Sequence, residues 1–558
     1  MSEISGKVSP KHTGFSPITS AQSRIHEIAT AASGIRAIDA KVAGTDDEGL
    51  LAEIGYKQEL KRRFSTFQIF GIAYSIMGIL PSVASLLGTA LTAGPAGAIW
   101  SWVVSSAFIL TIGIAMSELA SAIPTSGGLY YWTFYYAPEG WRVPLSFVIG
   151  LSNTMALCSG AVSVFYGNAE EILAAVYLTK NGDFDITAGK TYGVFAGCVI
   201  TGALVTCLSS KNVALLQSVS SICHTGLLVL FFIALPIGTK VNRGEFNHRG
   251  FIFGEVQNWS DWPIGWQFCL SFMTAVWTIG SFDSCVHMSE EAKNASYGVP
   301  IGICSSITVC GFLGFFILIC TVACMNPDVE AVLGTDTGFP MAQVIYDSLG
   351  NHWAIAFMSL MAACQWLMGS SLVTAASRQI WAFARDDGLP FCNIVKVVNK
   401  KLKVPIRAVI LACLISLAIG CLCLAGSAAA NALFSLGVLG NYLAWCTPVF
   451  LKLTYGKHKF TPGTFYLGPV LSPIVGWICC AWGVFIMILV CFPATKEVDK
   501  TDMNYCIVIT GGVWILSIIF FFTYKYKYYH GPKTNLNDET IEEDSSAENV
   551  PYPSDEKV

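Results

Sequence analysis

A carboxylic acid, Asp283, stands in a mostly apolar stretch of the chain, residues 275–287, shortly after Gly280 and Ser281. Such an acid costs about 2.5 to 3.5 kcal/mol at the centre of a bilayer unless it is paired, neutralised or wetted. A buried acid can keep a proton and release it once water enters from one side. Gly280 weakens a helix by about 1 kcal/mol relative to Ala. An unwound segment here would free peptide N–H and C=O groups, which suit the carboxylate and the ammonium group of a small zwitterion.

A second interruption lies in residues 74–82, where Gly78 and Pro81 fall within another apolar segment. Proline removes a backbone donor and clashes with the preceding turn. A packing glycine or a simple kink explains either break alone, because Gly and Pro are frequent in membrane helices. Interrupted segments in matching positions of two halves point to the binding site of a carrier. The two breaks together therefore favour a substrate site between the two segments.

The elements that must position these breaks are membrane helices. The chain is 53% hydrophobic and only 13% charged, and its mean hydropathy of +0.56 argues against a water-soluble globule. A spanning helix needs about 20 mostly apolar residues. Twelve such segments occur, at residues 66–91, 97–122, 143–178, 191–210, 213–238, 265–287, 298–325, 353–383, 405–425, 430–453, 466–492 and 503–527.

These segments predict an all-α integral membrane protein with twelve transmembrane helices. The breaks lie in the first and sixth helices, so we expect a 5+5 inverted repeat followed by two additional helices. Residues 1–64 are predicted to form a disordered cytosolic N-terminal tail, residues 65–528 the transporter domain, and residues 529–558 an acidic cytosolic C-terminal tail. Loops rich in Lys and Arg stay in the cytosol. Both termini are placed there by Lys57, Lys61, Arg62, Arg63, Arg385, Lys396, Lys400, Lys401, Lys403 and Arg407.

Neither a metal site, a cofactor nor an enzymatic activity is expected. The 20 Cys residues fall mostly inside apolar segments and form no paired C-x-x-C sets, so they read as small packing residues. The sequence contains no P-loop, no G-x-S-x-G elbow and no His-Glu-x-x-His motif. The expected partners are a small-molecule substrate, protons and membrane lipid, with no nucleic acid. The driving force would be a gradient rather than ATP.

Three motifs, in order along the chain, resemble transporters of the amino acid, polyamine and organocation superfamily. Residues 118–132, ELASAIPTSGGLYYW, are similar to the signature that follows the second span of that superfamily. Residues 289–294 resemble its Glu-Glu segment after the sixth span, and residues 384–390 resemble its loop after the eighth. Further stretches resemble the fungal γ-aminobutyrate (GABA) permeases of the amino acid/choline transporter branch: residues 51–60, 135–140, 277–287 and 528–532.

The resemblance implies a substrate site between the two breaks. Its first-span lining would be Ile76, Met77, Gly78, Ile79 and Leu80, and its sixth-span lining would be Trp277, Thr278, Gly280 and Ser281. The chain departs from many relatives, in which the first break reads Gly-Ser-Gly and the position of Ser281 is a Gly. These departures fit a ligand of a different shape from an ordinary α-amino acid. GABA, whose amine and carboxylate lie at opposite ends of a short chain, needs two separated polar poles.

Individual polar side chains carry specific predictions. Trp277 could form an aromatic lid over an ammonium group, an attraction of roughly 0.5 to 2 kcal/mol, or could be a packing residue. Asn153 could reach the pore or bond a neighbouring helix. Asp283 is the first choice for proton coupling, with capping of the following half-helix as the rival role. Glu118 could lock the inner gate.

Other ionisable residues in the spans receive plainer interpretations. Glu170 and Glu171 are expected near the outer surface as solvated acids. His224 and His287 could relay protons, but hydrogen-bonded structural roles are favoured.

We expect a secondary active transporter that imports GABA or a related ω-amino acid or amine, coupled to protons, by alternating access. A choline or polyamine carrier of the same family, a nutrient sensor that binds without transporting, and a channel remain alternatives. Neither predicted tail suggests the folded signalling domain that a sensor commonly needs. The plasma membrane is favoured slightly over the vacuolar membrane.

Overall fold

The computed structural model describes residues 46–254, 256–425, 427–498 and 503–533. Most of both predicted tails, residues 1–45 and 534–558, lies outside these described residues. By its contacts the chain divides into two units, one of residues 1–57 and 534–558 and the other Gln58–Lys533. The described part of the first unit contains helix α2 (Asp46–Glu53). The predicted domain boundaries at residues 64 and 528 stay predictions.

The regular secondary structure of the unit Gln58–Lys533 is helical, and the only β pairing among its described residues is an isolated bridge between Phe64 and Ala292. Its first half contains α3 (Thr66–Met77), α4 (Ile79–Ser85), α5 (Leu87–Leu91), α6 (Gly94–Ala122), α7 (Gly128–Tyr136), α8 (Arg142–Thr179), α9 (Ala188–Thr206), α10 (Ser210–Asn242) and α11 (Arg249–Phe253). Its second half contains α12 (Ile264–Leu270), α13 (Met273–Thr278), α14 (Ser284–His287), α15 (Ala295–Cys324), α16 (Val329–Leu333), α17 (Pro340–Leu349), α18 (Asn351–Arg385), α19 (Cys392–Val395), α20 (Ile406–Gly420), α21 (Ser427–Leu453), α22 (Gly468–Leu489) and α23 (Cys506–Thr523).

Eleven helical segments among the described residues are long and apolar enough to cross a membrane. Each corresponds to one of the predicted spans. The remaining predicted span, residues 265–287, is divided among α12, α13 and α14, so no single helix there is long enough. The prediction of an all-helical, multi-pass membrane protein is confirmed, whereas the count of twelve stays a prediction.

The first break follows from the backbone of Gly78. Helix α3 starts at a capping box, in which the Ser65 side chain and Gln68 each accept a hydrogen bond from the other's backbone N–H. It ends at Met77, and Gly78 has the left-handed conformation with φ +39°. The hydroxyl of Ser82 donates to the Met77 carbonyl at 2.7 Å, which satisfies one backbone group released by the break.

The second break lies between α13, which ends at Thr278, and α14, which begins at Ser284. Ser281 has φ +53°, a left-handed conformation that residues other than glycine seldom adopt. Both interruptions expected from the sequence are therefore present.

Small residues allow the long helices to approach closely. Helix α8 packs against α18 and α21, and α15 packs against α6 and α3. In the contact between α15 and α6, a Cβ added at Gly314 would lie 2.0 Å from the Trp102 ring. The Trp102 indole donates to the Gly311 carbonyl at 2.9 Å. Close contacts of this kind, together with interhelical hydrogen bonds, hold membrane helices together where lipid removes the hydrophobic driving force.

Replacing Gly314 by Val is expected to destabilise the protein by about 1 to 3 kcal/mol, because the new side chain overpacks the Trp102 contact. Thermal melting of the detergent-purified protein, followed by size-exclusion chromatography, measures the effect. Gly226→Ala in α10 is the control, since its added Cβ meets no atom within 4 Å. Equal melting temperatures for the two variants would contradict this packing.

Candidate substrate site and its two closures

The two helix breaks lie beside one small cavity inside the helical unit. The first-span side contributes Ile76, and the sixth-span side contributes Trp277, Thr278, Gly280 and Ser281. The remaining walls come from α8, α18 and α21 and from Val276: Gly160, Val164, Val276, Met368, Leu372, Gly437, Val438, Asn441, Tyr442 and Trp445.

Five residues expected to contact the substrate do not line this cavity: Met77, Gly78, Ile79, Leu80 and Asn153. Gly78 instead faces the Sδ of Met368 and the Nε2 of His224, which a Cβ would approach to 2.7 and 3.0 Å. His224, from α10, was not predicted to lie at the break. The predicted contacts of these residues with a substrate stay predictions.

The cavity is closed in this conformation. It offers about 30 Å³ to the centres of water molecules, room for one or two waters, since one needs about 10 to 15 Å³ on this measure. An amino acid does not fit until the walls move apart. Movement of this kind is what alternating access requires.

Three polar groups on the cavity wall lack a hydrogen-bond partner within the described part of the chain. They are the hydroxyls of Thr278 and Tyr442 and the indole N–H of Trp445, all buried. Buried polar groups are nearly always hydrogen-bonded, so unpaired ones call for a specific reason. A bound ligand with polar ends would supply it.

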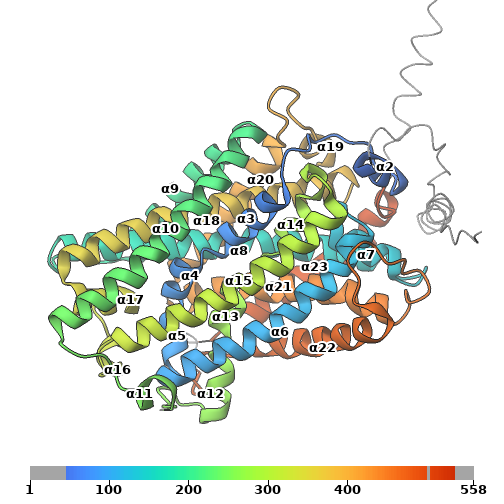
Figure 1. The fold of residues 1–558 in the computed structure, drawn as a ribbon. Helices are drawn as coiled ribbons and strands as arrows, with labels where there is room; N and C mark the ends of the chain where they lie inside the picture. The colour runs from blue at the N-terminus through green and yellow to red at the C-terminus, as the bar shows by residue number, and fades with distance from the viewer. Residues whose placement is uncertain (1–45, 255, 426, 499–502, 534–558) are drawn as a thin grey trace, which may run out of the picture. The chain divides into compact units, whose positions relative to one another are not determined.

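An aromatic pair separates this cavity from a larger one. The Trp277 indole donates to the Ser163 hydroxyl at 3.0 Å, and its ring meets Phe434 edge-on at 5.1 Å. Phe434 lines a cavity of about 550 Å³, together with polar residues such as Gln267 and Asn504. The lining of this larger cavity includes residues of α5 and α12. These two helices lie with α11 at one end of the unit, here named the α12 end (Figure 1).

Asp283 is held by side chains of neighbouring segments. Its Oδ2 accepts a hydrogen bond from Asn153 Nδ2 at 2.9 Å and lies 3.4 Å from His287 Nε2. Asn153 also donates to Asn441 Oδ1 at 3.3 Å. Asn153 thus bonds neighbouring helices, the second of its two predicted roles. The Asp283 side chain makes no cap hydrogen bond to α14, so the capping role is not observed.

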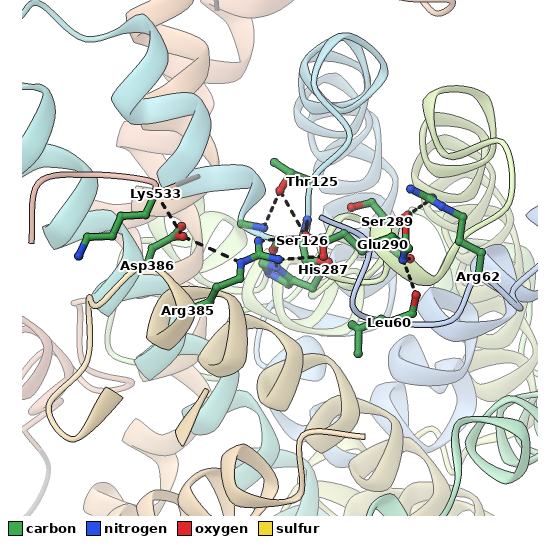
Figure 2. Close-up of polar contacts among 12 residues, drawn as sticks. Leu60, Arg62, Thr125, Ser126, His287, Ser289, Glu290, Arg385, Asp386 and Lys533 are labelled. Carbon is green, nitrogen blue, oxygen red and sulfur yellow. Dashed lines mark hydrogen bonds and ion pairs between the residues drawn. The ribbon is translucent and has the colours of Figure 1, made fainter. Parts of the chain in front are cut away.

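The opposite end of the unit contains α7, α14 and α19 and is here named the α7 end. At this end Glu290 is held by several hydrogen bonds. Arg385 binds both of its carboxylate oxygens, at 3.0 and 3.1 Å (Figure 2). The backbone N–H of Ser126 donates to Glu290 at 3.2 Å, and the Ser126 carbonyl lies 3.1 Å from His287 Nδ1. Paired buried charges with two parallel hydrogen bonds form a strong, directional link. We name the pair of Glu290 and Arg385 the clamp.

Asp386 extends the clamp toward the end of the chain. Its carboxylate accepts the Tyr130 hydroxyl at 2.7 Å. It also accepts the Lys533 backbone N–H at 3.4 Å (Figure 2). Burial raises the pKa of Tyr130, and the neighbouring Asp386 carboxylate raises it further, so Tyr130 remains a neutral donor.

Neither the clamp nor a second buried pair, Arg378 and Glu291 at 2.9 Å, was among the residues predicted for the site. The sequence nevertheless contains features that point to both pairs. Glu290 and Glu291 lie in one family motif and Arg385 lies in another, while Arg378 is a cation inside a predicted span. An intramembrane charge of this kind is a functional candidate by default.

Glu118, proposed as a gate or proton-coupling residue, is fully paired. It forms a buried ion pair with Lys452 of α21, and it accepts hydrogen bonds from the Ser472 hydroxyl at 2.6 Å and the Leu467 N–H at 3.1 Å. These contacts link α6 to α21 and α22. Its predicted role in gating stays a prediction.

Comparison with known proteins establishes the family. A family model described as amino acid permease matches residues 64–513. The chain is 57% identical over 516 residues to a GABA-specific permease of Saccharomyces cerevisiae, covering 92% of this chain and 90% of that one. It is 32% identical over 503 residues to an uncharacterized amino-acid permease of Schizosaccharomyces pombe, covering 89% and 91%. A protein of Candida albicans, provisionally named a polyamine transporter, is 30% identical over 505 residues, covering 89% and 90%.

The fold and the cavity thus belong to a multi-pass membrane permease, a class of transporter and not of enzyme. The chain belongs to the amino acid permease family, as its motifs indicated, and its partner is a small-molecule substrate.

Proposed function

We propose that this protein imports GABA, or a related ω-amino acid or amine, as a proton-coupled secondary transporter that works by alternating access. The observation that carries the proposal is the small closed cavity between the two helix breaks, in a chain 57% identical to a GABA-specific permease. The aromatic pair separates the cavity from the α12 end, and the clamp holds the α7 end together.

The cavity offers different partners to the two ends of the substrate. The Trp445 N–H and the Thr278 hydroxyl can donate to a carboxylate. The face of Trp277 can attract an ammonium group by a cation–π contact. A flexible ω-amino acid, whose charged groups stand apart, can reach both partners at once.

A polyamine or choline carrier is the second candidate, supported by the Candida albicans relative. A polycation is best held by carboxylates, and none of the cavity-lining residues is acidic. The lining therefore favours a zwitterion.

The finer architecture belongs to the same proposal. The split segment α12–α14 serves as the sixth of twelve spans, and the two breaks are equivalent positions of an inverted 5+5 repeat. We propose a cytosolic location for the α7 end and for both termini, supported by the basic residues gathered toward that end, among them Arg385 and Lys525. Residues 65–528 form the transporter domain, and the plasma membrane is the proposed site of action.

Proton coupling is proposed to run through Asp283 and the residues it contacts. Protonation of the Asp283 carboxylate would weaken its attraction for His287, which also contacts the Ser126 carbonyl beside the clamp. The proton would thereby link the sixth-span break to the α7 end. In the same scheme, the ion pair of Glu118 and Lys452 holds the α7 end shut.

Uptake into proteoliposomes containing the purified protein tests the proposal. Labelled GABA should accumulate saturably when the outside is acid, and unlabelled GABA should compete better than 5-aminolevulinate, putrescine or choline. Binding without uptake would identify a sensor, and entry without accumulation would identify a channel. Stronger competition by putrescine or choline would identify a cation carrier.

Trp277→Ala is expected to raise the KM for GABA by roughly 2- to 30-fold, which is the factor equivalent to a lost cation–π contact of about 0.5 to 2 kcal/mol. Initial-rate uptake measures this change. Trp477→Ala, at a half-exposed position on α22, is the control. An unchanged KM for the Trp277 variant would show that this ring only packs.

A further inference from the structure

Glu171 is a buried acid that belongs neither to the cavity wall nor to the clamp. Its side chain in α8 is 0% exposed, and neither carboxylate oxygen has a hydrogen-bond partner in the part of the chain that the structure describes. The expectation of a solvated surface acid is therefore wrong for Glu171, whereas the adjacent Glu170 is partly exposed.

Other fully buried carboxylates of the described residues have partners. Glu118 pairs with Lys452, and Glu290 and Glu291 pair with Arg385 and Arg378. Asp283 contacts His287, and Asp386 accepts the Tyr130 hydroxyl. Among these acids, Glu171 alone lacks both a basic partner and a donor.

Helical geometry places Glu171 on the stripe of α8 that faces the substrate cavity. Residues 160, 164, 167 and 171 follow one another at spacings of four, three and four, which puts them on a single face. Gly160 and Val164 line the small cavity, and a Cβ at Gly167 would meet Gln365 and Ser85. At a rise of 1.5 Å per residue, Glu171 lies about 10 Å beyond Val164, on the side away from α7.

The groups around Glu171 do not compensate a negative charge. Two titratable residues interact electrostatically with Glu171. They are Glu170 on the same helix and Cys364 on α18. Neither is a cation. An ionised carboxylate buried without a partner is strongly disfavoured, and such a group takes up a proton instead.

We propose that Glu171 is the entry point, on the α12 side, for the proton that is coupled to substrate import and that passes on to Asp283, a proposal that rests on the proposed transport function. With the protein closed, as here, the carboxyl group is protonated and neutral. When the cavity widens during transport, a water molecule in it accepts the proton of Glu171 for transfer toward Asp283, and the Glu171 carboxylate is left ionised. The ionised carboxylate cannot be buried again at low cost. The empty protein therefore changes to the conformation open at the α12 end only while water remains in contact with Glu171. In that conformation Glu171 takes up a new proton.

Two assays on proteoliposomes of the full-length protein test the assignment. Exchange of labelled for unlabelled GABA requires no net proton movement, whereas GABA-dependent acidification of the lumen, reported by a trapped pH-sensitive dye, requires it. Glu171→Gln mimics the protonated acid in shape and charge. The Glu171→Gln variant should exchange GABA at the wild-type rate. The number of protons that enter per GABA should fall at least about ten-fold, which is equivalent to about 1.4 kcal/mol or more of lost coupling.

Glu170→Gln is the matched control, because it removes the neighbouring acid from the same helix turn. This variant should behave as the wild type in both assays. Wild-type proton entry in Glu171→Gln overturns the inference, and so does an equal loss of exchange and proton entry, since that outcome assigns Glu171 to folding or substrate binding.

A second variant decides the matter if Glu171→Gln does not fold. Glu171→Asp keeps the carboxyl group, so it should retain coupled proton entry with a shifted pH dependence of uptake, whereas an unshifted pH dependence contradicts the assignment. Failure of this inference is distinct from failure of the transport proposal, because only the latter predicts that the wild type itself does not exchange GABA.

Discussion

Gly78→Val is expected to abolish GABA transport, lowering the uptake rate on the order of a hundred-fold or more. Gly78 has φ +39°, a conformation that costs an L-residue about 1 to 2 kcal/mol. Its Cβ would also approach Met368 Sδ to 2.7 Å and His224 Nε2 to 3.0 Å, and overpacking adds about 1 to 3 kcal/mol. The first-span break would straighten or shift, and the cavity beside it would lose its shape.

Gly197→Val in α9 is the matched control, because a Cβ at Gly197 meets no atom within 4 Å. This variant should transport at nearly the wild-type rate. Uptake by both variants should be compared at equal amounts of folded protein in the membrane. Normal uptake by Gly78→Val would remove the first break from the transport mechanism.

Arg385→Gln is expected to have the largest effect on stability. It leaves the buried carboxylate of Glu290 without its cation, and removal of one partner of a buried ion pair costs about 3 to 5 kcal/mol. We expect low yields of folded protein and a much reduced melting temperature. The double variant Arg385→Gln/Glu290→Gln removes the stranded charge, so it should recover most of the lost stability.

A double-mutant cycle on the melting temperature measures this coupling. Lys396→Gln serves as the control: Lys396 is 40% exposed and lies 3.9 Å from Asp387, and an exposed pair contributes about 0 to 1 kcal/mol. Additive effects of the two clamp substitutions would contradict a direct link between Glu290 and Arg385.

The sequence predicted where the chain breaks better than it predicted what faces the cavity. Gly78 and Gly280 predict the helix interruptions because glycine and a nearby proline weaken a helix locally. Whether a neighbouring side chain lines the cavity depends on how each half-helix is rotated against α8, α18 and α21. That rotation is set by packing between residues distant in sequence, so Ile76 lines the cavity while Ile79 does not.

The sequence also did not predict which polar side chains bond to each other. The motifs holding Glu290 and Arg385 were visible, but a distance of 95 residues separates them, and only the fold makes them a pair. Glu171 shows the opposite case. Its position near the end of a span suggested contact with water, but the length of α8 and the close packing of its glycine face bury the side chain.

A structure determined by electron cryo-microscopy with saturating GABA tests the central claim most directly. We expect density for one GABA molecule between Ile76 and the segment 277–281, in a cavity enlarged beyond the present 30 Å³, with its carboxylate toward Thr278 and Trp445. GABA bound elsewhere in the protein, or first and sixth spans that run as continuous helices, would contradict the account.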